Sequence, residues 1–168
     1  MLSVIILCED SAAPDRPEAI VRTLVPLVGA AVKGLVRDVV VAGPRGRELQ
    51  LIGDHAGCAI VEADSVSERL ARGYAAAKGD TLMLLAAGHI PETGFFEEVE
   101  DVLAAGLAAR GFFLRALPET LIEKVMPKTV GLIAPRAQCA GAGAASLRDL
   151  IAALKPRDLL RRRLRRVA

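Results

Sequence analysis

The chain has 168 residues, a length typical of one domain with a substantial buried core. Aromatic residues make up only 3% and Trp is absent, which argues against a base-stacking surface for nucleic acid. The three cysteines are distant from one another and odd in number, so neither a disulfide framework nor a structural zinc site is expected. The first apolar run is too short to span a bilayer and lacks the basic start and cleavage site of a signal peptide, so we expect a cytoplasmic protein.

The charge is unevenly distributed. Residues 155–168 hold seven Lys or Arg and one Asp, a net charge of +6, whereas the whole chain carries +2 and the preceding body therefore −4. We expect residues 1–154 to form the domain and residues 155–168 a basic tail. Leu160, Leu164 and Val167 recur at helical spacing in this tail. Such a helix either packs its leucines on the body or binds anionic headgroups, as a peripheral contact with the inner face of the membrane.

Strands and helices are predicted to alternate along the chain. Continuous apolar runs typical of strands buried on both faces occupy residues 2–7, 39–41, 58–61 and 81–85, with weaker candidates at 112–117 and 130–134. The first predicted helix begins at Asp15, its candidate N-cap, and ends or kinks at Pro26. Further helices are predicted at 48–55 with Gly57 as C-cap, at 65–78, within 91–110 and at 147–154. This order predicts an α/β fold, a single domain with a mostly parallel sheet and helices on both faces, as in Rossmann-like nucleotide-binding proteins.

Ligands of such sheets bind beyond the carboxyl ends of the strands, so the three loops that follow strands define the expected site. The candidate binding residues in these loops are Cys8, Glu9, Asp10, Gly43, Arg45, Arg47, Gly88 and His89. Guanidinium groups bind phosphate in a bidentate manner, which makes the two arginines the natural phosphate ligands. The alternatives are solvated loop charges for the arginines, polar surface for His89, a helix start for Glu9 and Asp10, and simple packing for Cys8.

Three segments carry a family resemblance. Residues 3–10 read SVIILCED, residues 73–85 read GYAAAKGDTLMLL, and residues 90–96 read IPETGFF. Together they resemble family 2 glycosyltransferases, which have the GT-A fold. The resemblance implies a nucleotide-sugar or nucleoside diphosphate partner, and a divalent Mg²⁺ or Mn²⁺ held by a DxD-type motif.

The chain departs from the family at the positions that would do the chemistry. An aspartate ends the second strand in the family, where this chain has Gly43, and a helix asparagine corresponds to Ala71. The DxD-type motif is degenerate and becomes Ala86-Ala87-Gly88, which offers no hard oxygen side chain to a divalent cation. We therefore expect no metal site and no certain cofactor. The family's late catalytic aspartate corresponds to Asp149, as a retained base or as a surface carboxylate.

Three functions remain open at this point. The first is a glycosyltransferase-like protein whose metal-dependent catalysis is lost or altered. The second is a non-catalytic GT-A-like domain that acts in binding or regulation. The third is a nucleotidyltransferase-like enzyme, which would want a glycine-rich phosphate loop after the first strand, whereas residues 8–16 contain no glycine.

Overall fold

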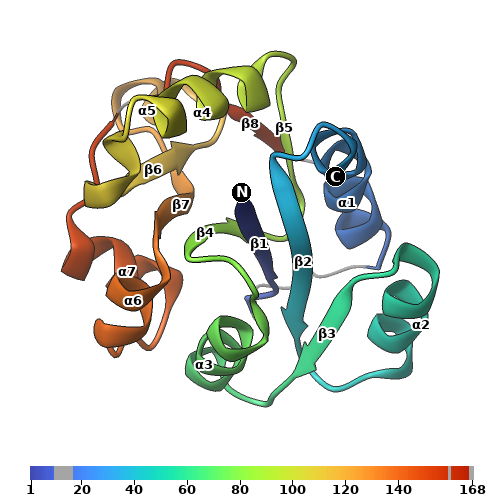
Figure 1. Cartoon of the computed structure of the whole chain (residues 1–168). Helices are drawn as coiled ribbons and strands as arrows, with labels where there is room; N and C mark the ends of the chain where they lie inside the picture. The colour runs from blue at the N-terminus through green and yellow to red at the C-terminus, as the bar shows by residue number, and fades with distance from the viewer. Residues whose placement is uncertain (10–16, 159, 167–168) are drawn as a thin grey trace.

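The computed structural model describes residues 1–9, 17–158 and 160–166 and contains a central six-stranded sheet (Figure 1). The strand order is β3-β2-β1-β4-β7-β6. These strands are β1 (Leu2–Leu7), β2 (Val36–Gly43), β3 (Ala59–Glu62), β4 (Thr81–Ala86), β6 (Phe112–Arg115) and β7 (Thr129–Pro135). The first four are mutually parallel, and β7 pairs antiparallel with both β4 and β6. The expected α/β class with a mostly parallel sheet is confirmed.

Helices cover both faces of the sheet. Helices α1 (Pro17–Val32), α2 (Arg47–Ala56) and α4 (Phe95–Ala104) pack on one face, where their apolar residues join those of the strands in one core cluster. Helices α3 (Val66–Ala76), α6 (Arg136–Gly141) and α7 (Leu147–Leu154) form the second cluster on the other face. All six residues of β1 are buried, as expected for a strand covered on both sides. No helix in the described parts of the chain is long and apolar enough to cross a membrane.

The prediction that the helix ends at Pro26 is wrong, because α1 continues through this residue to Val32. A proline inside a helix removes one backbone hydrogen bond and costs roughly 3 kcal/mol. Here the apolar face of α1 is buried on both sides of the proline, from Ile20 to Ala30, and this burial holds the helix together. The predicted N-cap of this helix, Asp15, lies outside the described residues.

The C-terminal segment is extended rather than helical, which corrects the expected tail helix. Strand β8 (Leu164–Arg166) pairs antiparallel with the short strand β5 (His89–Pro91). The Glu98 carboxylate accepts the backbone N–H groups of Arg161 and Arg162, both at 2.8 Å, and Glu92 accepts that of Arg163. Leu160 and Leu164 are buried, so this part of the tail packs on the body, while Val167 lies outside the described residues.

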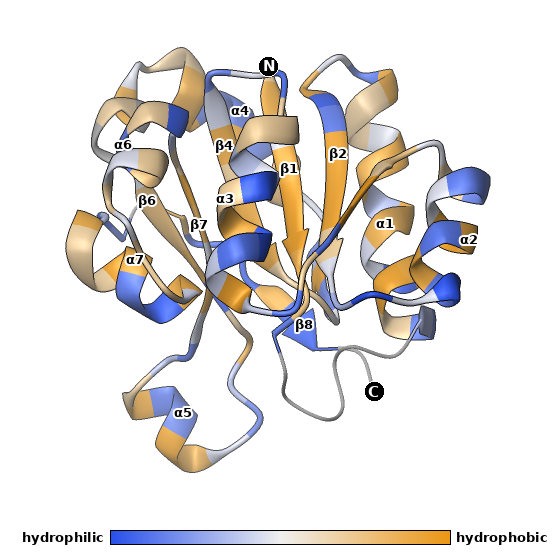
Figure 2. Cartoon of the chain, turned by 90° about the horizontal axis from the view of Figure 1, so that it is seen from below, coloured by the Kyte–Doolittle hydropathy of each residue, from blue (hydrophilic) through white to orange (hydrophobic). Residues whose placement is uncertain are grey.

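One connection leaves the body of the fold. Between β6 and β7 the chain forms the short helix α5 (Leu121–Val125), which projects beyond the sheet in Figure 2. The remaining element is a 3₁₀ turn, η1 (Leu107–Arg110), between α4 and β6. Because β6 ends and β7 begins at the carboxyl edge of the parallel strands, α5 projects from that same edge.

Candidate functional site

The carboxyl edge of the parallel strands is the site expected from topology. The chain adds β2 and β3 on one side of β1 and then crosses to β4 on the other side, so the topological switch lies between β1 and β4. Cys8 follows β1, Gly43 ends β2, and Ala86 ends β4, so the structure brings the three predicted loops to one edge. Asp10, another predicted binding residue, lies outside the described part of the chain.

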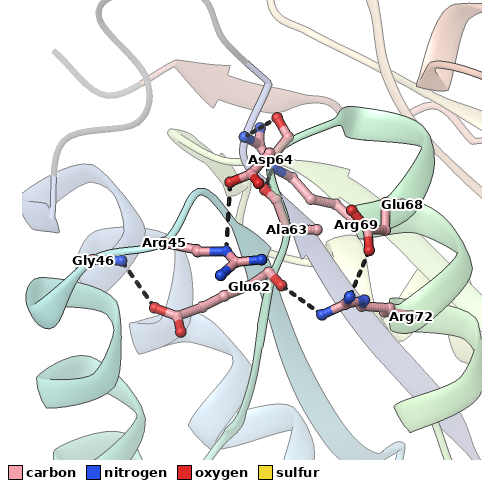
Figure 3. A network of polar contacts seen from close by, with 8 residues as sticks. All are labelled: Arg45, Gly46, Glu62, Ala63, Asp64, Glu68, Arg69 and Arg72. Atoms are coloured by element: carbon pink, nitrogen blue, oxygen red, sulfur yellow. Dashed lines mark hydrogen bonds and ion pairs between the residues drawn. The ribbon is translucent and has the colours of Figure 1, made fainter.

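A buried arginine holds this edge together (Figure 3). Arg69 of α3 is 1% exposed, and its guanidinium donates to the carbonyl oxygens of Ala63 at 2.8 Å, Cys8 at 2.9 Å and Asp64 at 3.2 Å. These carbonyls follow β1 and β3, which are not adjacent in the sheet. Hydrogen bonds to a buried charge are strong and fix geometry, so Arg69 sets the relative position of the two loops. Arg69 is not among the residues predicted from the sequence.

The corner at the end of β2 has no room for a side chain. A Cβ added at Gly43 would lie 2.7 Å from Leu49 Cδ1 and 3.2 Å from Cys8 Sγ. The aspartate that the resemblance leads one to expect at this position therefore does not fit the packing of this chain. Cys8 is itself fully buried, and its side chain helps to close the corner.

The loop after β2 is basic and exposed. Arg45 pairs with Asp64, whose Oδ1 lies 3.5 Å from Arg45 Nε, and both side chains are mostly exposed. Arg47 is exposed at the first position of α2, where the helix dipole also favours an anion. The backbone N–H of Gly46 donates to Glu62 Oε1 at 2.9 Å. The loop thus presents two guanidinium groups, but it also lies against two acids from the end of β3.

The corner at the end of β4 is closed by internal hydrogen bonds. The Nδ1 atom of His89 lies 3.1 Å from the Ala86 oxygen and 3.3 Å from the Ala87 oxygen. Since a carbonyl oxygen only accepts, we assign the proton to Nδ1, so the ring donates to these oxygens. Burial lowers the pKa of His89, which favours this neutral form. Gly88, at φ 79°, donates its N–H to the buried hydroxyl of Thr23 at 3.1 Å.

These contacts decide whether a divalent metal fits at the position that the resemblance implies. The side chains of Ala86 and Ala87 carry no oxygen, and their carbonyl groups already accept from His89. Within residues 1–9, 17–158 and 160–166, no group of three His, Cys, Asp or Glu side chains could hold a metal ion. Because Mg²⁺ and Mn²⁺ require several oxygen ligands, the residues present at the end of β4 do not fit such a metal.

A second set of cations, absent from the sequence-based site, lies beside His89. Arg166 is the direct partner of His89 in the pairing of β5 with β8. The positive charges of Lys128, just before β7, and of Arg166 also depress the pKa of His89, after the larger effect of burial. Long-range strand pairing places both cations here, through β7 with β4 for Lys128 and through β8 with β5 for Arg166. In the sequence they are 39 and 77 residues from His89.

Two predicted acidic residues lie near each other at the same edge. Glu9 Oε1 accepts the backbone N–H of Leu147 at 3.4 Å, so α7 begins beside the end of β1. Asp149, two residues on, is exposed and shares a capping arrangement with Ser146, whose Oγ accepts its N–H at 3.1 Å and donates to its Oδ2 at 2.8 Å. Asp149 therefore lies in the first turn of α7, where it takes part in the N-cap that Ser146 forms.

The cavity at the candidate edge is small, and a much larger one lies elsewhere on the molecule. A hollow of about 110 Å³ lies at the carboxyl edge, between Cys8, Ile20, Arg45 and Leu49. Its volume suits a phosphate-sized group rather than a whole nucleotide. A hollow of about 910 Å³ lies between α3 and α6, with Tyr74, Asp80 and Cys139 in its lining. Ser67 lies at the start of α3 and Asp80 precedes β4, so this larger hollow runs along α3 toward the opposite edge of the sheet.

Comparison with known proteins identifies the fold. No family model matches this sequence, and no curated protein matches it either. Among solved structures, glucosyl-3-phosphoglycerate synthase from Mycobacterium tuberculosis, in complex with Mn²⁺, UDP and glucosyl-3-phosphoglycerate, is 16% identical with a TM-score of 0.64. The match covers 92% of this chain and 65% of the synthase, so this chain spans less than two thirds of that protein.

Two further similar structures come from another group of enzymes. 4-Diphosphocytidyl-2C-methyl-D-erythritol synthase is 15% identical with a TM-score of 0.62, and the match covers 95% of this chain and 86% of that protein. The bifunctional IspDF from Campylobacter jejuni is 11% identical with a TM-score of 0.62, over 92% of this chain and 46% of that protein. At 11–16% identity these likenesses concern the fold, which this chain shares with the three enzymes.

The Arg69 contacts predict a large and specific loss of stability. Replacing Arg69 with Met leaves buried carbonyl oxygens without a donor, and we expect the free energy of unfolding to fall by about 3 kcal/mol. The matched control is Arg72→Met on the same helix, because Arg72 is exposed and pairs with Glu68 at the surface, so its loss should stay within about 0.5 kcal/mol. Urea unfolding of both variants tests this, and similar losses would show that Arg69 is not a special contact.

The packing at Gly43 predicts that even a methyl group is harmful there. Gly43→Ala should destabilise the protein by roughly 1–3 kcal/mol, because the new Cβ overlaps Leu49 and Cys8. Gly46→Ala, three residues on, is the control, since its added Cβ meets nothing within 4 Å and its φ of 175° suits any residue. Thermal unfolding should show a lower Tm for the first variant alone. An unchanged Tm for Gly43→Ala would mean that the corner can open.

The buried His89 predicts a pH dependence of stability. Its folded pKa lies below the ordinary value of 6.5, so below that pH the unfolded chain binds a proton that the folded chain does not. Stability should therefore fall as the pH falls through 6.5, by at most about 1.4 kcal/mol per pH unit from this group. His89→Asn keeps a side-chain N–H donor but does not titrate, so its urea midpoint should fall less. Equal slopes for both proteins would contradict the assignment.

Proposed function

We propose that this chain is a glycosyltransferase-like GT-A domain that binds a nucleoside diphosphate or a nucleotide sugar without a divalent metal. The observation that carries this proposal is the placement of cations on both sides of the carboxyl edge. Arg45 and Arg47 follow β2, while Lys128 and Arg166 lie beside His89. A diphosphate needs its charge neutralised, and guanidinium and ammonium groups can do this where the metal ligands are missing.

The exposed loop after β2 is the part of the site able to exchange partners. The ion pair of Arg45 with Asp64 is long, at 3.5 Å, and exposed, so an incoming phosphate can replace the carboxylate at little cost. Arg47 and the N-terminus of the ten-residue helix α2 add to the same positive field. In this proposal the phosphates lie at the small hollow beside Arg45, and the rest of the nucleotide extends along the open edge.

The remaining predicted residues keep supporting roles in the proposal. Glu9 and Asp10 are the candidates for hydrogen bonds to the ribose or base. Gly88 and His89 form the floor of the site, because their polar groups already bond to Thr23, Ala86 and Ala87. Asp149 is the candidate base, through Oδ1, since Oδ2 accepts from Ser146. Without a metal to stabilise the leaving diphosphate, any sugar transfer should be slow, and a purely binding or regulatory role follows if transfer is absent.

Isothermal titration calorimetry tests the proposal. We expect UDP or UDP-glucose to bind in EDTA and Mn²⁺ to leave the Kd nearly unchanged. Arg45→Ala/Arg47→Ala should weaken binding by at least about tenfold, because each charge-assisted hydrogen bond contributes roughly 1.5–3 kcal/mol. The control is Arg37→Ala/Lys78→Ala, which removes two cations at the amino edge of the same sheet and should leave Kd unchanged.

The ligand panel separates the other functions from this one. GDP- and dTDP-sugars test the choice of base, and CTP tests a nucleotidyltransferase. Preference for CTP with release of pyrophosphate would replace the proposal with that enzyme class. Absence of binding across the panel by a folded protein would refute nucleotide binding altogether.

A further inference from the structure

The arm between β6 and β7, defined here as residues 118–128, exposes an unusual group of aliphatic residues. Leu121, Ile122, Val125 and Met126 are 78%, 75%, 83% and 74% exposed. No residue of α5 is buried, and the helix stands clear of the body in Figure 2. Four large aliphatic side chains presented on one short projection form a patch of the kind that contacts a partner or a membrane.

The arm has its own local structure, so these residues are not needed to hold the body together. Thr120 caps α5 by accepting the N–H of Glu123 at 3.2 Å. Glu123 Oε2 in turn accepts the N–H of Glu119 at 2.8 Å. The Glu123 carboxylate is therefore turned back into the cap, and Lys124 stands exposed among the aliphatic residues.

Cations border the base of the arm. Leu117, the residue before the arm, donates its N–H to the Leu164 oxygen at 2.7 Å, which fixes the base of the arm beside β8. Leu117 also lines a hollow of about 350 Å³ together with Arg162 and Arg165. Across the described residues, no side-chain carboxylate forms an ion pair with Lys124, Arg162 or Arg165. Glu92 also lines this hollow and Glu119 is exposed on the arm, but neither forms an ion pair with these three cations, which stay open to solvent.

We propose that the arm docks on an anionic bilayer surface, with its aliphatic tip among the acyl chains and Lys124, Arg162 and Arg165 at the headgroups. Aliphatic burial combined with attraction of cations to anionic lipid is the physical basis of such peripheral binding. This inference does not rest on nucleotide binding. It moves the expected membrane contact from a tail helix to the arm and its neighbouring arginines.

The charges favour a bilayer over the other occupants. A second copy of this chain seated on the arm by a two-fold axis would bring the same cations against each other. A nucleic acid would use the cations, but the arm offers no aromatic ring for stacking and its aliphatic tip would stay exposed. An anionic lipid surface satisfies both the aliphatic tip and the cations at once.

Sedimentation with vesicles tests the proposal. The full chain should pellet with vesicles of phosphatidylcholine and phosphatidylglycerol in equal parts, and not with phosphatidylcholine alone. Leu121→Ser/Ile122→Ser and Arg162→Gln/Arg165→Gln should each lower the partition coefficient by about tenfold or more. The control is Val25→Ser/Val28→Ser on α1, where the side chains are 65% and 64% exposed, and this variant should pellet like the parent chain.

Two measurements keep the result interpretable. Circular dichroism should show that the arm variants remain folded, since α5 buries no residue. Analytical ultracentrifugation reports the oligomeric state without vesicles. Equal pelleting of all variants would overturn the proposal. A parent chain that forms a dimer and does not bind vesicles, together with an arm variant that is monomeric, would overturn it as well. Binding lost only in the arm and arginine variants, with nucleotide affinity unchanged, would establish the docking surface independently of the proposed function.

Discussion

The buried guanidinium of Arg69 is the contact on which the candidate edge depends. It reaches from α3 to carbonyl oxygens after β1 and after β3, two strands that have β2 between them in the sheet. A charge taken out of water is tolerated only where hydrogen bonds replace its hydration. The loops must therefore keep their carbonyl groups turned toward Arg69. This constraint leaves the outer side of the edge to side chains such as Arg45 and Asp64 (Figure 3).

The two positions at which the family resemblance leads one to expect acids are both used for packing. At the end of β2, Leu49 and the buried thiol of Cys8 occupy the space of any side chain at Gly43. At the end of β4, the ring of His89 donates a hydrogen bond to the carbonyl oxygens of Ala86 and Ala87. Neither corner is an open site that merely lacks a carboxylate. Restoring an aspartate would meet the packing at Gly43 or the closed loop at the end of β4, so the two losses are structurally independent. Only the loss at the end of β4 concerns the ligands of a metal.

The local features of the fold could be predicted from the sequence, because they depend on nearby residues. Continuous apolar runs located β1 and β4 closely, and the segment 147–154 is helical at the bounds predicted. The C-terminal segment was predicted wrongly, because its leucines fit a helical period while its backbone is fixed by Glu92 and Glu98 far away in the chain. One feature of the sequence points to Arg69. It lies four residues before Gly73 and so shares with it the buried face of α3, where an arginine is unexpected.

The pairing of β5 with β8 places two arginines of the tail, Arg165 and Arg166, in different surroundings. Alternate residues of a strand point to opposite faces, so Arg166 shares a face with Leu164, whereas Arg165 faces the other way. Arg166 accordingly neighbours His89, while Arg165 lines the hollow beside Leu117 at the base of the arm. A diphosphate and a bilayer therefore need not compete for one side chain, although both would lie at the same edge. If both sites are used, the lipid surface would meet the protein where the phosphates bind. A membrane-bound acceptor could then reach that edge without leaving the bilayer.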